Sequence, residues 1–164
     1  MCIWRNPERT MRRIFPEASD YRTVTKTISS KQREIIESRL GFQLLPGQRE
    51  QFQYFSMTGK NGKQIGTIIA ASQKGEYGAI EFVFGLDTNL VIKGIYIQRS
   101  RERDQSFKKR EFLDLFAGRN IKDVSSFIEF YTGDKSAGTD AVIQGLDKEC
   151  ITYKEIVLSN NTAK

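Results

Sequence analysis

The stretch Gly133-Asp134-Lys135-Ser136-Ala137-Gly138-Thr139-Asp140 contains only small or polar residues and leads directly into the longest amphipathic segment of the sequence. In that segment apolar side chains recur at spacings of three and four, which predicts a helix over about residues 140–158. The apolar stripe consists of Val142, Leu146, Cys150, Tyr153 and Val157. We expect this stripe to pack on a β-sheet, because a helix with one apolar face needs a second layer to cover it.

The loop before this helix has two interpretations. Small residues at a helix start are typical of an anion site, because the first N–H groups lack intrahelical partners and the helix dipole favours negative charge. Small side chains let a phosphate approach the backbone, and Ser136 and Thr139 add hydroxyl groups. The same residues also fit an ordinary N-cap, in which Thr139 or Asp140 accepts a bond from the free N–H groups.

Four segments upstream have the length and the β-branched and aromatic content of strands, and short turns separate them. They span residues 51–57, 65–71, 79–84 and 90–98. The second is almost continuously apolar, which indicates that both of its faces are covered. The sequence therefore predicts an α+β fold, with an antiparallel sheet of four or more strands, packed helices and a long C-terminal helix.

Two further helices are predicted from local signals. One begins at Ser29, which forms a capping box with Gln32, and ends at Gly41. The other covers about residues 106–117. Its side chains expected to face inward are Phe107, Phe112, Leu115 and Phe116. Over residues 119–131 the strand and helix signals are balanced.

The N-terminal part is basic and contains large apolar side chains. Four arginines precede Pro16, together with Trp4 and Phe15, and the proline ends any helix there. We interpret residues 1–25 as a basic arm that packs Phe15 and Trp4 onto a domain formed by residues 26–164. A membrane-surface segment or a linker is the alternative.

Composition limits the classes of function. The 164 residues suit one domain, and 38% hydrophobic with 28% charged residues is typical of a soluble globular protein. The net charge of +6 suits an anionic partner, but it is too small an excess to indicate nucleic acid. No run approaches the roughly 20 apolar residues that span a bilayer, so we expect any membrane anchor to lie outside this sequence.

The absence of histidine removes the commonest general base and metal ligand, so a Ser-His-Asp triad is impossible and a metal site is not expected. The two cysteines, Cys2 and Cys150, lie far apart and form no CxxC pair, although a disulfide between them remains open. No pair of acid and base residues stands out. We therefore predict no catalytic residues.

Several short motifs, taken together, are similar to those of a known family. They are Phe15-Pro16-Glu17-Ala18, the hairpin Lys74-Gly75-Glu76-Tyr77-Gly78-Ala79-Ile80 followed by Gly85-Leu86-Asp87, the helix Phe112-Leu113-Asp114-Leu115-Phe116-Ala117-Gly118, and Ser136-Ala137-Gly138-Thr139. With them, residues 15–157 resemble the FMN-binding domain of the flavin-carrying subunits of the sodium-pumping quinone reductase and of the Rnf electron-transport complex.

The resemblance implies FMN as a cofactor, held covalently or noncovalently. In that family the threonine of a Ser-Gly-Ala-Thr motif can be joined to FMN through a phosphoester made by a flavin transferase. The carry-over makes Thr139 the acceptor, with Ser136, Ala137 and Gly138 shaping the loop. It also implies a redox partner protein or a membrane electron-transport complex, and hence a membrane-associated or extracytoplasmic location.

This sequence departs from the family pattern in two places. The inner pair of the motif is inverted, and the leading aspartate aligns with Gly133 while Asp134 comes one residue later. The family's Glu-Thr-Pro-Gly-Leu-Gly segment, which helps to line the flavin, is replaced by residues 99–105, which contain no proline or glycine. The chain is a divergent member of the pattern.

Residues 99–110 carry six basic and two acidic side chains, a net charge of +4. They are interpreted as a solvated turn, as a flavin contact through Arg99 or Arg101, or as a docking surface for an acidic partner. Tyr77, beside Gly78, could stack on an isoalloxazine ring or simply lie at a strand edge.

Two functions follow as hypotheses. The first is an electron-transfer flavoprotein domain in which the flavin carries the chemistry. The second keeps the fold without flavin, as an interaction or assembly module of a membrane-associated redox complex that uses residues 99–110. Neither hypothesis makes the chain an independent enzyme.

Overall fold

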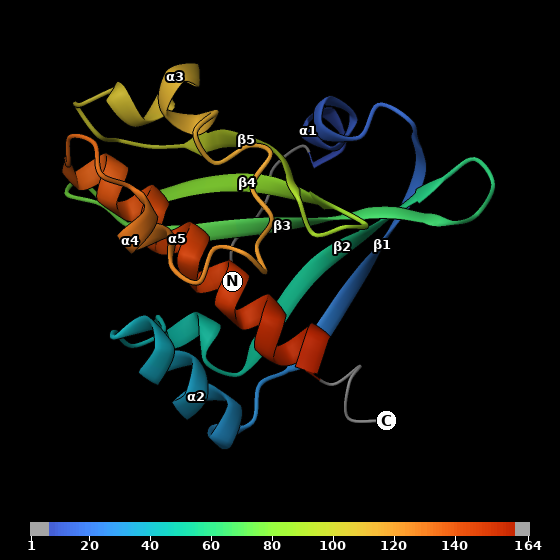
Figure 1. Cartoon of the computed structure of the whole chain (residues 1–164), viewed down its shortest axis with the longest axis horizontal. Helices are drawn as coiled ribbons and strands as arrows, with labels where there is room; N and C mark the ends of the chain where they lie inside the picture. Colours follow the sequence, from blue (N-terminus) through green and yellow to red (C-terminus); the bar gives the residue numbers. More distant parts are fainter. Residues whose placement is uncertain (1–6, 160–164) are drawn as a thin grey trace.

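A computed structural model describes residues 7–159. Its centre is an antiparallel sheet of five strands, each paired with the next in sequence (Figure 1). The strands are β1 (Ala18–Thr27), β2 (Gln51–Gly59), β3 (Gln64–Lys74), β4 (Ala79–Asp87) and β5 (Ile92–Arg99). The predicted α+β class is confirmed, and β1 is the strand that was not among the four predicted.

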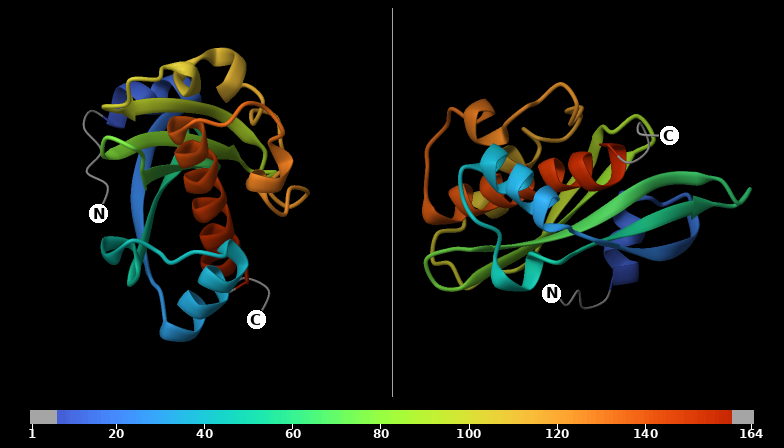
Figure 2. Two further views of the ribbon diagram at one scale, coloured as in Figure 1. Left: turned by 90° about the vertical axis from the view of Figure 1, so that its left-hand side faces the viewer. Right: turned by 90° about the horizontal axis from the view of Figure 1, so that it is seen from below.

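The helices lie on both sides of this sheet (Figure 2). The long helix α5 (Ala137–Tyr153) and α2 (Ser30–Leu40) cover one face, while α1 (Pro7–Ile14) covers part of the other. The shorter helical pieces are α3 (Arg110–Leu113), α4 (Phe127–Phe130), 3-10 turns at Pro46–Gln48 and Ser106–Lys108, and a π turn at Lys154–Leu158.

Strand β3 contributes to a hydrophobic core on each face, as its continuous apolar run predicts. Ile69 lies in the main core under α5, whereas Ile68 lies in a smaller core with Met11 of α1. The ring of Phe15 fills the space over Gly66 of β3, where an added Cβ would lie 2.3 Å from that ring. Phe15 is therefore packed on the sheet, while Trp4 lies outside the described residues.

Strands β2 and β3 are paired over only part of their length. Their pairing runs from Thr58–Gln64 to Phe55–Ile68 and stops there, although β2 remains paired with β1 and β3 with β4. The sheet thus opens into a fork between the first half of β2 and the second half of β3 (Figure 1). Helix α5 crosses one face of the sheet at this fork.

The helix predicted over residues 106–117 is broken into two short pieces. Lys109 is extended, with φ −69° and ψ 140°, and separates the 3-10 turn from α3. Phe107, Phe112 and Phe116 are buried as expected, but Leu115 is 45% exposed, so its predicted inward position was wrong.

Local capping signals were more reliable. The capping box of Ser29 and Gln32 is present at the start of α2, and Gly41 ends the helix with a left-handed φ of 78°. The segment 119–131, where signals were balanced, contains a bridge between Val91 and Asn120 and the single-turn helix α4. Strand β1 pairs with β2 along residues 18–27, across the position expected to separate arm from domain.

Candidate functional site

The predicted phosphate loop forms the N-terminus of α5, and its polar groups are hydrogen-bonded to one another. The helix begins three residues earlier than expected, at Ala137, and its N-cap is Ser136 rather than Thr139 or Asp140. The N–H of Thr139 donates to the Ser136 hydroxyl at 3.1 Å. The hydroxyl of Thr139 accepts from the Ser136 N–H at 2.7 Å and donates to its carbonyl at 3.1 Å.

Packing closes the same loop from the side. Thr139 is 2% exposed, and an added Cβ on Gly138 would lie 2.2 Å from the ring of Phe107. Glycine is therefore needed at this position because an aromatic side chain from residues 106–108 contacts the first turn of α5. The remaining predicted loop residue, Ala137, is exposed.

The second predicted element, the β3–β4 hairpin, carries Tyr77 at its tip. This side chain is 42% exposed, and the guanidinium of Arg103 lies 5.2 Å from its ring centroid. Gly78 has a φ of +118°, which favours glycine, and its carbonyl accepts from Gly75 at 2.8 Å. The N–H of Tyr77 donates to the Glu102 carboxylate at 2.9 Å.

Residues 99–105 connect this hairpin to the start of α5 through two acidic side chains. Glu102 is 6% exposed and lies under the hairpin, where it also fills the space over Gly75. Asp104 accepts from the Ser106 N–H and hydroxyl, at 3.0 and 2.7 Å. A hydrogen bond with the Ser136 side chain is the largest cause that lowers the pKa of Asp104 to about 2, with the Ser106 bonds next.

The structure therefore brings the loop of Ser136–Thr139, the hairpin of Tyr77 and Gly78, and residues 99–105 into one region. Sequence reasoning did not identify Glu102 and Asp104, the residues that join them. The sequence feature that could have indicated them is the placement of two acidic residues among the arginines of residues 99–104.

Arg99 and Arg101, the two arginines predicted to contact a flavin, lie apart from the loop of residues 136–139. Arg99 lines a groove of about 580 Å³ beside β5, formed with Arg13 of α1 and with Lys108 and Arg110. None of the described lining residues is acidic, and none belongs to the loop of residues 136–139. Arg101 is exposed and is not among the groove residues.

Tyr96 forms the aromatic part of this groove, and two cations lie against its ring. The guanidinium carbons of Arg13 and Arg110 lie 5.6 and 5.0 Å from its ring centroid. Arg110 also donates to the Ile95 carbonyl at 2.5 Å and lies 3.9 Å from Asp114. Arg99 makes no ion pair within residues 7–159.

Comparison with known proteins shows the fold. The structure is similar to that of NqrC from Shewanella oneidensis, with a TM-score of 0.53. The similarity covers 93% of this chain and 88% of NqrC, at 12% sequence identity. No protein-family model matches the chain, and no curated protein matches its sequence.

The fold family raises the question of whether a flavin phosphate fits at Thr139. The Thr139 hydroxyl already accepts one hydrogen bond and donates another within the capping box, and the side chain is buried. The Asp104 carboxylate, hydrogen-bonded with the Ser136 side chain, adds a negative charge beside the same helix start. In this conformation the residues do not fit a phosphoester at Thr139, although the surrounding segments of that region are all present.

Within residues 7–159 no cluster of three or more acidic, cysteine or histidine side chains is placed to hold a metal ion. Cys150 is a buried free thiol, and burial raises the pKa of that thiol. Cys2 lies outside the described residues. No helix in the described part of the chain has the length and apolarity to cross a bilayer.

Proposed function

We propose that this chain is a flavin-free interaction module that docks an acidic partner protein in the groove beside β5. The observation that carries the proposal is the gathering of Arg13, Arg99, Lys108 and Arg110 around one groove without an acidic lining residue. Like charges placed this close repel one another, and an anionic partner would relieve that repulsion. The partner would belong to a membrane-associated redox complex, as the family resemblance suggests.

The groove has features that suit recognition of carboxylates. Arg110 and Arg13 are held in place by Tyr96, which reduces the side-chain freedom lost on binding. Arg99 is exposed and has no ion-pair partner among residues 7–159, so its guanidinium can bind a carboxylate with two parallel bonds.

Charge reversal tests the proposal. The double variant Arg99→Glu with Lys108→Glu should weaken binding of a short polyglutamate peptide at least about tenfold, as measured by fluorescence anisotropy. The matched control, Lys60→Glu with Lys63→Glu, makes the same change of charge in the β2–β3 turn and should bind nearly as the parent does. Equal losses in both variants, or no binding by the parent at low ionic strength, would overturn the groove as a docking site.

A second candidate, an FMN-carrying electron-transfer domain, is favoured by two observations. The fold is similar to that of NqrC, and residues 99–105 contact both the hairpin, through Glu102 and Tyr77, and the start of α5, through Asp104 and Ser136. Co-expression with a flavin transferase followed by intact-mass and visible spectra tests it. A mass increase of one FMN less water, absent in Thr139→Ala, would replace the flavin-free proposal with covalent flavin carriage.

Noncovalent flavin needs a separate measurement. Titration of FMN into the purified chain, followed by flavin fluorescence, should show no saturable binding below millimolar concentration if the module is flavin-free. Saturable binding that survives in Thr139→Ala would establish a noncovalent carrier. The groove variants keep the two results distinct, because Arg99 and Lys108 lie outside the loop of residues 136–139.

A further inference from the structure

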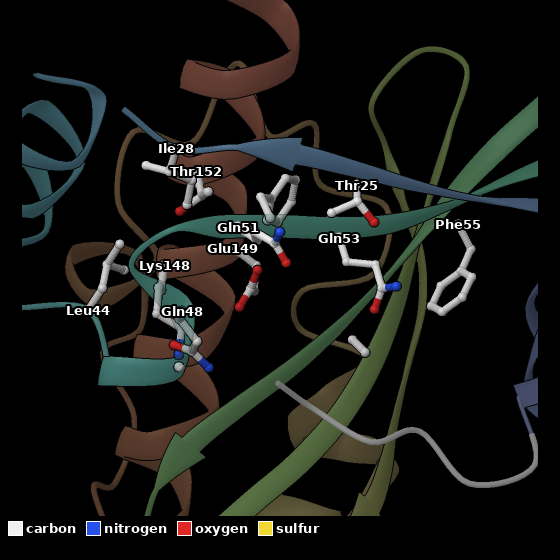
Figure 3. Close-up of a pocket in the computed structure, with 13 residues that line it drawn as sticks. Thr25, Ile28, Leu44, Gln48, Gln51, Gln53, Phe55, Lys148, Glu149 and Thr152 are labelled. Atoms are coloured by element: carbon white, nitrogen blue, oxygen red, sulfur yellow. The ribbon is translucent and has the colours of Figure 1, made fainter. Parts of the chain in front are cut away.

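A second cavity lies in the fork of the sheet, away from both regions described above. It measures about 220 Å³ and is bounded by β1, β2, the 3-10 turn at Pro46–Gln48, Ala70 of β3 and the middle of α5 (Figure 3). It exists because β2 and β3 separate beyond the Phe55–Ile68 pair, so that within residues 7–159 no strand covers the face of α5 at this point. The α5 residues that line it are Lys148, Glu149 and Thr152.

Lys148 stabilises the edge that the fork leaves open. Its ammonium group donates to the Ser72 carbonyl at 2.6 Å and to the Gln73 side-chain oxygen at 2.7 Å. The side-chain nitrogen of Gln48 donates to the same Ser72 carbonyl at 3.2 Å. These hydrogen bonds take the place of the backbone hydrogen bonds that a paired β2 strand would make to β3. Lys148 therefore has a structural role here.

Glu149 has no such partner. It is 7% exposed, and its carboxylate reaches into the cavity from α5 (Figure 3). Within residues 7–159 no hydrogen bond or ion pair is made by this carboxylate; the neighbouring charge that acts on it is Lys148. A carboxylate this buried is disfavoured as an anion unless a donor is supplied, and burial accordingly raises the pKa of Glu149.

Gln48 also lies on the cavity wall. Within residues 7–159 its side-chain oxygen has no hydrogen-bond partner, but this oxygen is shielded from solvent and does not open onto the cavity, while its amide nitrogen is satisfied. The Glu149 carboxylate is therefore the acceptor that an occupant of the cavity can reach, and a buried acceptor is normally paired with a donor. The donor side chains nearby, Gln51, Gln53 and Thr152, come from β2 and α5 and line the same space.

We infer that this cavity binds a small organic cation, with an ammonium group that donates to Glu149 and a short apolar body against Phe52, Leu44 and Ile28. An ammonium group supplies several donors and a positive charge, whereas an anion would be opposed by Glu149. Lys148 lines the same cavity, but its ammonium group donates to the oxygens of Ser72 and Gln73. The volume equals about seven water-sized groups at ~30 Å³ each, which suits a short alkylammonium rather than a nucleotide. This site is independent of the groove proposed for protein docking.

The test uses the whole chain and n-butylammonium chloride as the probe. Titration followed by the backbone amide resonances of Glu149, Thr152 and Gln51 should give saturable shifts confined to the cavity. Glu149→Gln, which keeps the shape and removes the charge, should weaken the affinity at least about tenfold. The matched control Glu129→Gln removes an exposed carboxylate on α4 and should bind as the parent does.

Further probes separate the ammonium from other occupants. Butanol has the same apolar body without the charge, and butyrate carries the opposite charge; both should bind at least about tenfold more weakly than butylammonium. Equal binding of butanol, an unchanged affinity in Glu149→Gln, or no saturable shifts with butylammonium would overturn the proposal. If Glu149→Gln does not fold, Thr152→Leu places a larger side chain in the same cavity from α5 and should also weaken binding.

This result stands apart from the protein-docking proposal. The double variant Arg99→Glu with Lys108→Glu should bind butylammonium as the parent does, because neither residue lines the fork cavity. A loss of butylammonium binding in that variant would contradict the assignment of the probe to the fork.

Discussion

Replacing Glu149 with glutamine should stabilise the protein above neutral pH and change its stability little in acid. Burial raises the pKa of Glu149 from its ordinary value of 4.5 to about 7, and the charge of Lys148 acts in the opposite direction. The folded state thus binds this proton more tightly than the unfolded state does. The free energy of unfolding therefore falls as pH rises from about 4.5 to about 7 and is flat on either side of that window.

The magnitude follows from the difference between the two pKa values. At about 1.4 kcal/mol for each pKa unit, the penalty for ionising Glu149 approaches about 3 kcal/mol above pH 7. At about pH 5 most of that penalty is absent, so the gain from the substitution between about pH 5 and pH 8 should differ by about 2–3 kcal/mol. For a chain of this length such a gain raises the melting temperature by roughly 4–12 °C.

Urea denaturation followed by far-UV circular dichroism measures this gain at both pH values. The comparison between parent and variant cancels the other titrating groups, because they are common to both proteins. Glu129→Gln, which changes an exposed carboxylate, should show a pH-independent difference close to zero. A difference for Glu149→Gln that is the same at pH 5 and pH 8 would refute the assignment of this carboxylate as buried without a donor.

Three other predictions concern the start of α5. Ser136→Ala removes the capping box and should lower the free energy of unfolding by about 1 kcal/mol in urea denaturation; an unchanged midpoint would contradict the cap. Gly138→Ala places a Cβ against Phe107 and should destabilise by about 1–3 kcal/mol, whereas Ala137→Ser at the exposed neighbouring position should be nearly neutral in the same assay. Because hydrogen bonds lower the pKa of Asp104 to about 2, its stabilising effect is present above its ordinary pKa of 3.8 and is lost as pH falls through 2. Thermal melts of Asp104→Asn from about pH 2 to pH 5 should lack that acid-dependent loss, and a parent-like acid profile would count against the bond to Ser136.

The parts of the fold that the sequence predicts are those with local signals. The capping box at Ser29 and the glycine at position 41 define α2, since both act within one helical turn. The apolar run of β3 indicates two covered faces without any knowledge of what covers them. Strand β1 lacked such a signal because it is an edge strand with mostly exposed polar side chains, and its pairing with β2 defines it.

The candidate sites depended on contacts that the sequence does not display. A run of small residues before a helix predicts a cap and a phosphate loop equally well. What distinguishes them is Phe107 and Asp104, which reach the α5 start from a segment about thirty residues earlier. Likewise Glu149 lies between members of an apolar stripe and reads as a polar surface residue until the separation of β2 from β3 is known.

In the folded chain the acidic side chains of residues 99–105 contact neighbouring segments, whereas Arg99 and Arg101 face solvent. Glu102 turns inward beneath the hairpin, and Asp104 is bonded to Ser136 and Ser106, so both acidic side chains are engaged by neighbouring segments. Arg99 and Arg101 stay exposed, which leaves the outer side of the segment cationic although the sequence alternates in sign. The carboxylate that closes the α5 start and the arginine that lines the groove thus come from one short segment. Removing the charge of Asp104 would add to the positive charge beside the groove, while the Ser136–Thr139 capping box would still close the start of α5. We therefore expect Asp104→Asn to strengthen binding of polyglutamate, measured by fluorescence anisotropy.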